Sequence, residues 1–239
     1  MNLSLAHSLL DLAFPRACAG CRGRAGDEFH YICWDCLAAI RMVQPPFCLL
    51  CGDPGQGDLP EKYFCAACIR QKPFFDCARS AATYTGLVKD MILDFKYHGA
   101  TWLAPDLGRI MFACLSAHFN AANIDCVTCV PLHRTRARER TYNQAWLLAR
   151  EVAARLGREA LDCLARARAT ESQTHLTSAA RADNVRGKFA ARKGPGFLKG
   201  RRVLLVDDVM TTGATVNECA RVLKESGAQE VLVLTLARG

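Results

Sequence analysis

Residues 202–215 read RVLLVDDVMTTGAT and join an apolar run, two acids and a threonine-rich loop. The apolar run, Val203–Val206, is typical of a central strand covered on both faces. The loop offers three threonine hydroxyls and an accessible backbone at Gly213, ahead of a helix expected to begin near Ala214. Ligands of parallel sheets bind beyond the carboxyl ends of strands, so this loop is expected to be a phosphate socket at a helix N-terminus. No lysine follows the glycine, which argues against an ATP-binding Walker A loop.

Two adjacent carboxylates, Asp207 and Asp208, follow the apolar run. Neighbouring strand residues point to opposite faces, so we expect the chain to turn here if both acids serve one ligand. A carboxylate accepts hydrogen bonds from hydroxyls, and ribose 5-phosphate carries vicinal hydroxyls at a short distance from a phosphate. The segment therefore predicts a site for a sugar phosphate, and a simple acidic cap on an exposed strand end is the alternative.

The chain from residue 77 alternates between strand and helix patterns. We expect strands at 82–84, 125–130, 202–207 and 230–236, and helices at 86–97, 103–121, 143–157 and 214–226, with a polar stretch at 169–187. Such alternation predicts an α/β domain with a mostly parallel sheet and helices on both faces.

Cysteine is concentrated near the N-terminus, where eight of the 14 cysteines form four Cys-x-x-Cys pairs. In chain order the pairs are Cys18/Cys21, Cys33/Cys36, Cys48/Cys51 and Cys65/Cys68. This spacing predicts two structural Zn²⁺ sites, each closed by four thiolates, with the pairs combined in sequential order. A crossed combination, redox thiols and an iron–sulfur cluster stay open as alternatives.

A fifth pair, Cys126/Cys129, is not expected to bind metal. It lies in an expected strand, where positions three apart point to opposite faces.

Composition favours a packed protein without a membrane span, since 51% of the 239 residues are hydrophobic and 23% are charged. Residues 1–16 are expected to form a short amphipathic helix. Within them Arg16 follows the apolar residues and no basic residues stand before these, which is unlike a secretory signal, so we expect a cytoplasmic protein. The net charge of +8 falls entirely in residues 81–239, and residues 134–202 hold 17 basic against 6 acidic side chains. This excess of positive charge favours a polyphosphate ligand or nucleic acid, with a solvated basic surface as the alternative.

Residues 203–215 resemble the phosphoribosyl-pyrophosphate motif of the type I phosphoribosyltransferases. With the four cysteine pairs ahead of it, nearly the whole chain resembles the ComF family, whose members are also known as GntX-like or amidophosphoribosyltransferase-like proteins. The resemblance implies a double zinc ribbon module in 1–76 and a type I phosphoribosyltransferase-like domain in 77–239. It also implies phosphoribosyl pyrophosphate as ligand, bound with Mg²⁺ by the motif residues Asp207, Asp208, Val209, Met210, Thr211, Thr212, Gly213, Ala214 and Thr215.

Two further segments resemble parts of that family. Residues 131–144 resemble its pyrophosphate-side loop, which assigns Arg134, Arg136 and Arg140 to the diphosphate, with Arg136 and Arg140 acting in catalysis alongside the two aspartates. The family usually has Gly-Phe where this chain has Thr141-Tyr142, and loss of the glycine is expected to restrict a left-handed conformation. Residues 168–189 resemble the flexible loop that closes over the active site, with Gln173, Arg181 and Asn184 as its candidate contacts. Lys96 lies in a recurrent family segment and is equally well read as a surface lysine.

The resemblance implies displacement of diphosphate from C1 of phosphoribosyl pyrophosphate by a nitrogen nucleophile, without identifying the acceptor or showing that turnover occurs. The family is associated with natural competence, the uptake and processing of transforming DNA. Two non-catalytic alternatives are therefore a protein that binds single-stranded DNA and a zinc-ribbon adaptor for DNA-processing competence proteins that uses the pocket as a ligand sensor.

Overall fold

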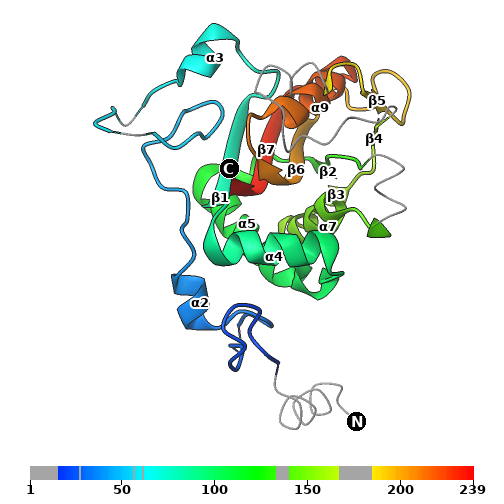
Figure 1. Ribbon diagram of the computed structural model, residues 1–239. Helices are drawn as coiled ribbons and strands as arrows, with labels where there is room; N and C mark the ends of the chain where they lie inside the picture. The colour runs from blue at the N-terminus through cyan, green and yellow to red at the C-terminus, as the bar shows by residue number, and fades with distance from the viewer. Residues whose placement is uncertain (1–15, 27, 56, 61, 133–139, 167–184) are drawn as a thin grey trace.

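The computed structural model describes residues 16–26, 28–55, 57–60, 62–132, 140–166 and 185–239 (Figure 1). The helix expected within residues 1–16 lies almost wholly outside these ranges. The candidate site residues Arg134, Arg136, Gln173, Arg181 and Asn184 also lie outside them.

A five-stranded parallel sheet forms the centre, with strand order β1-β7-β6-β2-β3. Its strands are β1 (Cys77–Thr83), β2 (Cys126–Cys129), β3 (Glu159–Ala160), β6 (Arg202–Met210) and β7 (Glu230–Arg238). The predicted strands at 125–130, 202–207 and 230–236 are thus confirmed in type, whereas β1 begins earlier than expected. The central position of β6 agrees with its uninterrupted apolar run.

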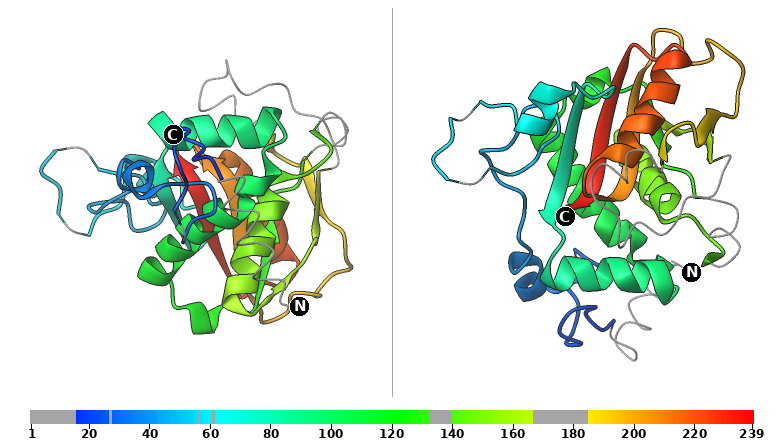
Figure 2. Two further views of the ribbon diagram at one scale, coloured as in Figure 1. Left: turned by 90° about the horizontal axis from the view of Figure 1, so that it is seen from below. Right: turned by 45° about the horizontal axis from the view of Figure 1, so that its top comes forward.

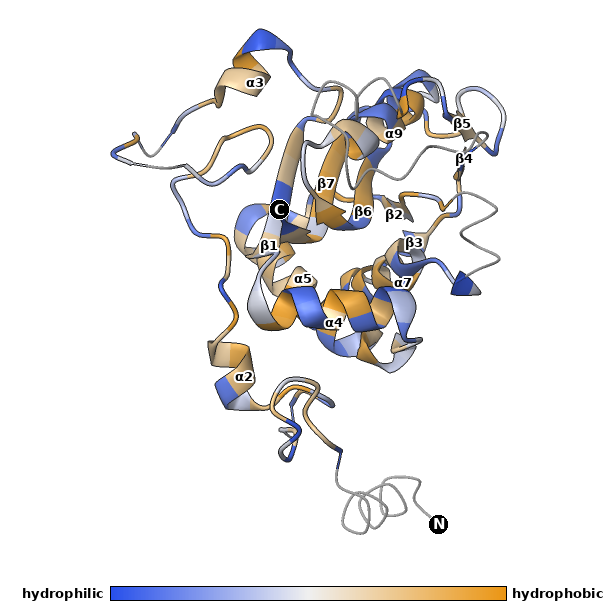
Figure 3. Cartoon of the chain, viewed as in Figure 1, coloured by the Kyte–Doolittle hydropathy of each residue, from blue (hydrophilic) through white to orange (hydrophobic). Residues whose placement is uncertain are grey.

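Helices cover both faces of this sheet (Figures 1 and 2). Leu204 and Val206 face one apolar cluster, which holds α4 (Gly86–Tyr97), α5 (Ala104–His118) and α7 (Gln144–Leu156). Val203 and Leu205 face a second cluster, which holds α9 (Ala214–Glu225). Figure 3 shows the apolar colouring that continues along β6 and β7 between these layers. The predicted parallel sheet with helices on both faces is therefore confirmed.

Short elements complete the described domain. The single-turn helices η1 (Thr101–Leu103) and η2 (Ala121–Asn123) flank α5. The strands β4 (Leu164–Arg166) and β5 (Phe189–Ala191), which the sequence patterns do not indicate, pair antiparallel. Among the described residues, no helix combines the length and apolar character that crossing a membrane requires.

The chain does not turn at the acid pair, so that expectation is wrong. β6 continues through Asp207 and Asp208 to Met210 because β7 pairs with it along its whole length. On the other side β2 ends at Cys129, which pairs with Val206, and the last contact is from the Val130 N–H to the Val206 carbonyl. β6 therefore extends beyond the end of β2. Because β2 no longer lies beside this part of β6, the side chains of Asp207 and Asp208 can both reach the same space.

The cysteine-rich region forms two modules that pack on different faces of the sheet. The first ribbon, residues 16–40 with α2 (Trp34–Ala38), contributes Phe29, Ile32 and Ile40 to the cluster of α4, α5 and α7. The second ribbon, residues 47–70 with α3 (Ala66–Arg70), contributes Cys48, Cys51 and Cys68 to the cluster of α9.

The segment between the two ribbons runs along the edge of the sheet. Met42 bridges antiparallel to Ala82 of β1, and the Val43 N–H donates to the Ala81 carbonyl. This connection covers the edge of β1 and carries the chain from one face to the other (Figure 1).

Candidate functional site

A pocket of about 370 Å³ opens at the carboxyl end of β6. Five residues of the 207–215 segment line it, namely Asp207, Asp208, Val209, Thr211 and Thr215. Arg140 is the one arginine of the predicted diphosphate set that lies in the described residues, and it lines the same pocket. Met210, Thr212, Gly213 and Ala214 are not in the lining. The structure thus brings together residues that are 75 positions apart in sequence, from Arg140 to Thr215 (215 − 140 = 75).

Gly213 shapes the loop between β6 and α9. Its φ of +77° is left-handed, and a Cβ built there would lie 2.7 Å from the Met210 side chain, so no other residue fits without a shift. The Ala214 N–H donates to the Thr212 hydroxyl oxygen at 3.4 Å, next to the N-terminus of α9. The loop therefore places two threonines, Thr211 and Thr215, in the lining of the pocket at a 12-residue helix whose dipole favours an anion.

The two carboxylates sit in different states. The Lys96 Nζ lies 2.9 Å from Asp208 Oδ1, and both side chains are largely buried. The Asp208 N–H donates to Asp207 Oδ1 at 2.9 Å. Burial and the negative charge of Asp208 raise the pKa of Asp207 to about 8, although Lys96 opposes this rise. A second negative charge beside Asp208 is therefore disfavoured in the ligand-free pair, and the ammonium of Lys96 lies against Asp208.

Lys96 is therefore not a surface lysine. Its side chain is 17% exposed and reaches the pocket from the last turn of α4. Burial by itself would lower the pKa of Lys96, but the attraction of Asp208 outweighs that effect and the pKa is raised. The recurrent segment around Lys96 was the only sequence signal for this residue, and it assigned no role.

The N-terminus of α7 supplies a second polar wall of the pocket. Asn143 caps the helix by accepting from the Ala145 N–H at 3.0 Å, while its amide donates to the Val130 carbonyl at 3.1 Å. The Gln144 Oε1 accepts from Arg140 at 3.3 Å. Gln144 is 1% exposed, and its Nε2 has no hydrogen-bond partner within the described part of the chain. A buried donor without a partner is costly, so this wall is suited to an oxygen-rich ligand.

The Thr141-Tyr142 pair does not prevent the loop from forming. Thr141 adopts the left-handed conformation with φ +63°, so the loop forms without the glycine, at a cost in backbone strain. The conformation is held by its neighbour, since the Tyr142 hydroxyl donates to the Phe95 carbonyl at 2.6 Å, one residue before Lys96. The tyrosine hydroxyl thus ties the basic loop to α4.

Aromatic residues and a further arginine complete the lining, and sequence patterns did not indicate them. Tyr97 is 63% exposed, and the Arg140 guanidinium lies 4.7 Å from its ring centre. Tyr84 lines the pocket directly after β1. Arg166, at the end of β4, lies in the lining and stacks over Phe189 at 5.3 Å.

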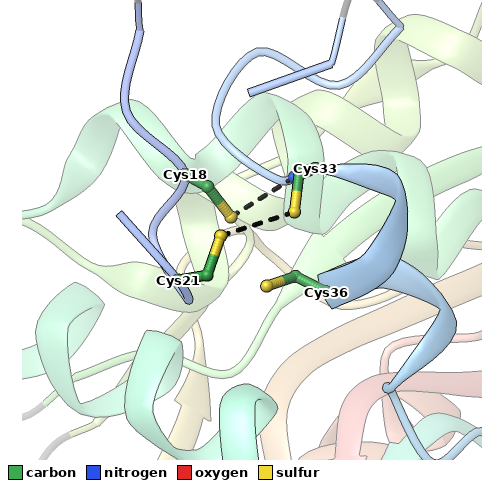
Figure 4. Close-up of side chains that lie close together, drawn as sticks. All are labelled: Cys18, Cys21, Cys33 and Cys36. Carbon is green, nitrogen blue, oxygen red and sulfur yellow. Dashed lines mark hydrogen bonds between the residues drawn. The ribbon is translucent and has the colours of Figure 1, made fainter. Parts of the chain in front are cut away.

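The eight paired cysteines form two tetrads. The first joins Cys18, Cys21, Cys33 and Cys36 (Figure 4), and the second joins Cys48, Cys51, Cys65 and Cys68. The sequential combination is thus confirmed and the crossed one is wrong. Within each tetrad the ligand atoms lie within 4.8 Å of one another.

Both tetrads fit Zn²⁺. The Cys21 and Cys33 sulfurs are 3.6 Å apart, as are those of Cys51 and Cys65. Tetrahedral Zn–S bonds of about 2.3 Å require sulfurs roughly 3.8 Å apart. Burial opposes ionisation of Cys18, but N–H groups directed at its sulfur, including that of Cys33 at 3.3 Å, lower its pKa to about 6.

In the second tetrad the thiol of Cys48 likewise has a lowered pKa, which favours the thiolate form that binds metal. Cys48 accepts from the Cys65 N–H at 3.3 Å, and its pKa is about 7 because such bonds outweigh burial. The two tetrads are therefore suited to two zinc ions, each enclosed by four protein ligands.

Cys126 and Cys129 behave as expected, because Cys126 faces the α9 cluster and Cys129 the opposite one.

Family models match two separate parts of the chain. Residues 9–69 match the family model of the double zinc ribbon domain, and residues 143–239 match that of the phosphoribosyl transferase domain. "DNA utilization protein YhgH" of Salmonella typhi is 30% identical over 233 residues, covering 95% of this chain and 99% of that protein.

Two further relatives are named for competence. "Competence protein F" of Haemophilus influenzae is 29% identical over 232 residues, covering 94% of this chain and 98% of the relative. "Competence protein ComFC" of Bacillus subtilis is 26% identical over 214 residues, covering 87% of this chain and 84% of the relative.

Among solved structures, the glutamine phosphoribosylpyrophosphate amidotransferase of Bacillus subtilis is 24% identical with a TM-score of 0.40. The matched part covers 59% of this chain and 30% of that one.

Proposed function

The chain belongs to the ComF family of competence and DNA utilization proteins, and on this basis we propose that it binds phosphoribosyl pyrophosphate with Mg²⁺ in the pocket at the end of β6. One observation carries the proposal: a pair of carboxylates and a threonine loop at a helix N-terminus line a single pocket.

The 5-phosphate of the ligand would bind the loop between β6 and α9. Thr211 and Thr215 offer hydroxyl donors, and the N-terminus of α9 adds N–H groups and a favourable dipole. Gly213 shapes this loop through its left-handed backbone. The ribose hydroxyls would donate to Asp207 and Asp208, which lie in the same lining.

The diphosphate would bind the wall formed by α7 and Arg140. Arg140 provides a guanidinium in the lining, and Gln144 Oε1 holds it by accepting a hydrogen bond from it at 3.3 Å. Asp208 is paired with Lys96, and burial raises the pKa of Asp207, so neither acid is a free carboxylate ligand in this pocket. Mg²⁺ would thus be held mainly through oxygens of the ligand, where it neutralises charge on the diphosphate.

With an acceptor present, the reaction would be transfer of the phosphoribosyl group from diphosphate to a nitrogen nucleophile. The C1–oxygen bond breaks, the C1–nitrogen bond forms, and the bond electrons leave with diphosphate. Arg140 and Gln144 would stabilise the charge that builds on the leaving group, while Asp207 and Asp208 orient the ribose. The two zinc sites serve the fold, since each already has four protein ligands.

Isothermal calorimetry with phosphoribosyl pyrophosphate and Mg²⁺ tests this proposal. The wild-type protein should bind, and the double variant Asp207→Asn, Asp208→Asn should lose the binding heat. Asp90→Asn, an exposed site on α4, is the matched control and should bind normally. An absence of binding by the zinc-loaded wild type would refute the proposal.

One observation favours single-stranded DNA as a second candidate ligand. Tyr97 presents a largely exposed ring at the pocket, stacked against Arg140, and such a pair suits base stacking beside a phosphate contact. Filter binding of an oligothymidylate should then show a steep salt dependence. The affinity should fall in Tyr97→Ala but not in Trp34→Ala, an equally exposed aromatic residue of the first ribbon. A flat salt dependence would remove this candidate.

A further inference from the structure

Arg238, at the end of β7, directs its side chain to the second ribbon. The residue is 9% exposed. Its Nε and one terminal nitrogen donate to Asp53 Oδ1 at 3.1 and 2.6 Å, and the other nitrogen donates to the carbonyl of Cys51 at 3.4 Å. Cys51 is a ligand of the second zinc site, and Asp53 follows it two residues later. We call residues 48–53 of the second ribbon the knuckle. The buried guanidinium thus donates its hydrogen bonds to groups of this knuckle.

The backbone of Arg238 contacts the other side, towards the pocket. Its carbonyl accepts from the Tyr84 N–H at 2.6 Å, and the following Gly239 N–H donates to the Met210 carbonyl at 3.1 Å. A Cβ built on Gly239 would lie 3.4 Å from Tyr84 and 3.5 Å from Thr211. Tyr84 and Thr211 both line the pocket. The last two residues therefore support the start of the phosphate loop from behind.

The knuckle that holds Arg238 also rests on β1. The Ala78 N–H donates to the Leu50 carbonyl at 2.7 Å, and Arg79 donates to the Leu49 carbonyl at 3.2 Å. At Gly52 the backbone passes so close that a Cβ would lie 2.5 Å from the Ala78 carbonyl oxygen. A segment this short keeps such a fold only while its metal is bound.

From these contacts we propose that Arg238 is a positioning residue that couples the second zinc site to the phosphoribosyl pocket. Loss of this zinc unfolds the knuckle and withdraws Asp53 and the Cys51 carbonyl, leaving the guanidinium without these partners. The end of β7 stays paired with β1 and β6 but loses the side-chain contact that fixes its position, so its support of Tyr84 and Thr211 loosens. Ligand affinity accordingly depends on whether the second zinc site is loaded. The ligand half of this inference rests on the proposed function.

The first ribbon provides an internal control. It docks on α5 through Asp106, whose carboxylate accepts from the backbone of His30 and Tyr31, and through Arg109, which donates to the Glu28 carbonyl and stacks over Phe29. Neither docking residue lines the pocket. Arg109 is thus an arginine that contacts a zinc ribbon without contacting the phosphate loop.

The test compares Arg238→Met with Arg109→Met in the full-length, zinc-loaded protein. Arg238→Met should weaken phosphoribosyl pyrophosphate binding at least tenfold in calorimetry and should speed release of one of the two zinc equivalents to a chromogenic chelator. Arg238→Lys, which can still pair with Asp53, should restore part of the affinity. Arg109→Met should keep the affinity within twofold of wild type. Because coupling is reciprocal, phosphoribosyl pyrophosphate with Mg²⁺ should slow release of one zinc in wild type but not in Arg238→Met.

Normal ligand affinity in Arg238→Met, or equal losses in both methionine variants, would overturn the inference. If Arg238→Met does not fold, Asp53→Ala removes the carboxylate that accepts two of the Arg238 hydrogen bonds and must give losses in the same direction. If wild type binds no phosphoribosyl pyrophosphate, the proposed function fails and hydrogen exchange decides the coupling separately. Amides of residues 210–215 should then exchange faster in Arg238→Met than in Arg109→Met, and equal exchange would overturn it.

Discussion

Replacing Asp207 by asparagine should change how the stability of the protein depends on pH. Asparagine keeps the shape of the side chain and the acceptor for the Asp208 N–H, but it cannot ionise. In the ligand-free native state burial and Asp208 raise the pKa of Asp207 from 3.8 to about 8. Between about pH 4 and pH 8 the native protein thus holds one proton more at this site than the unfolded chain. The stabilisation that this bound proton gives the native state is complete below pH 4 and is lost as the pH rises towards 8.

The size of the effect follows from the two pKa values. Within that window each rise of one pH unit lowers the free energy of unfolding of the wild type by about 1.4 kcal/mol, and this dependence levels off near pH 8. From pH 6 to pH 7.5 the wild type should lose about 2 kcal/mol that Asp207→Asn does not lose. In a chain of this length that corresponds to roughly 4–8 °C in Tm.

Thermal unfolding in the presence of zinc and the absence of ligand measures this difference. Between pH 6 and pH 7.5 the Tm of Asp207→Asn should rise by roughly 4–8 °C relative to that of wild type. Zinc release and other titrations affect both proteins alike and cancel in this difference. Asp90→Asn, an exposed acid, should run parallel to wild type. Parallel curves for Asp207→Asn as well would refute the raised pKa.

Other predictions concern Lys96, Thr141 and the metal. Lys96→Met should destabilise the protein by about 3 kcal/mol in thermal unfolding at pH 7.5, because it leaves the buried Asp208 unpaired. Adding Asp208→Asn should recover most of that loss, and no recovery would contradict the pairing. Thr141→Gly should raise the Tm by roughly 2–8 °C, since a left-handed threonine costs about 1–2 kcal/mol; an unchanged or lower Tm would contradict the strain. Metal analysis should return about two zinc per chain, and removal by a chelator should unfold both ribbons; iron, or no metal, would contradict the zinc assignment.

Local patterns were sufficient for most of the elements in residues 77–239. The helix 86–97 coincides with α4, and the helix 214–226 with α9 to within a residue, because hydrophobic periodicity is written in consecutive residues. The Cys-x-x-Cys spacing likewise predicted four-cysteine sites, since both thiolates of a pair come from one turn. Gly213 likewise marked the loop just before α9, and the structure adds that this glycine has a left-handed backbone.

Contacts between distant residues had no such signature. Lys96 pairs with Asp208 across 112 positions (208 − 96 = 112), and Arg238 reaches Asp53 across 185. The choice between sequential and crossed cysteine tetrads depended on each ribbon packing against a different face of the sheet. Extension of β6 through the two acids required β7 as a partner along its full length. Hydrophobic periodicity shows which face of a single helix or strand is buried. The charge balance and the shape of the pocket depend on which separate segments pack together, and the pattern within one segment does not carry that information.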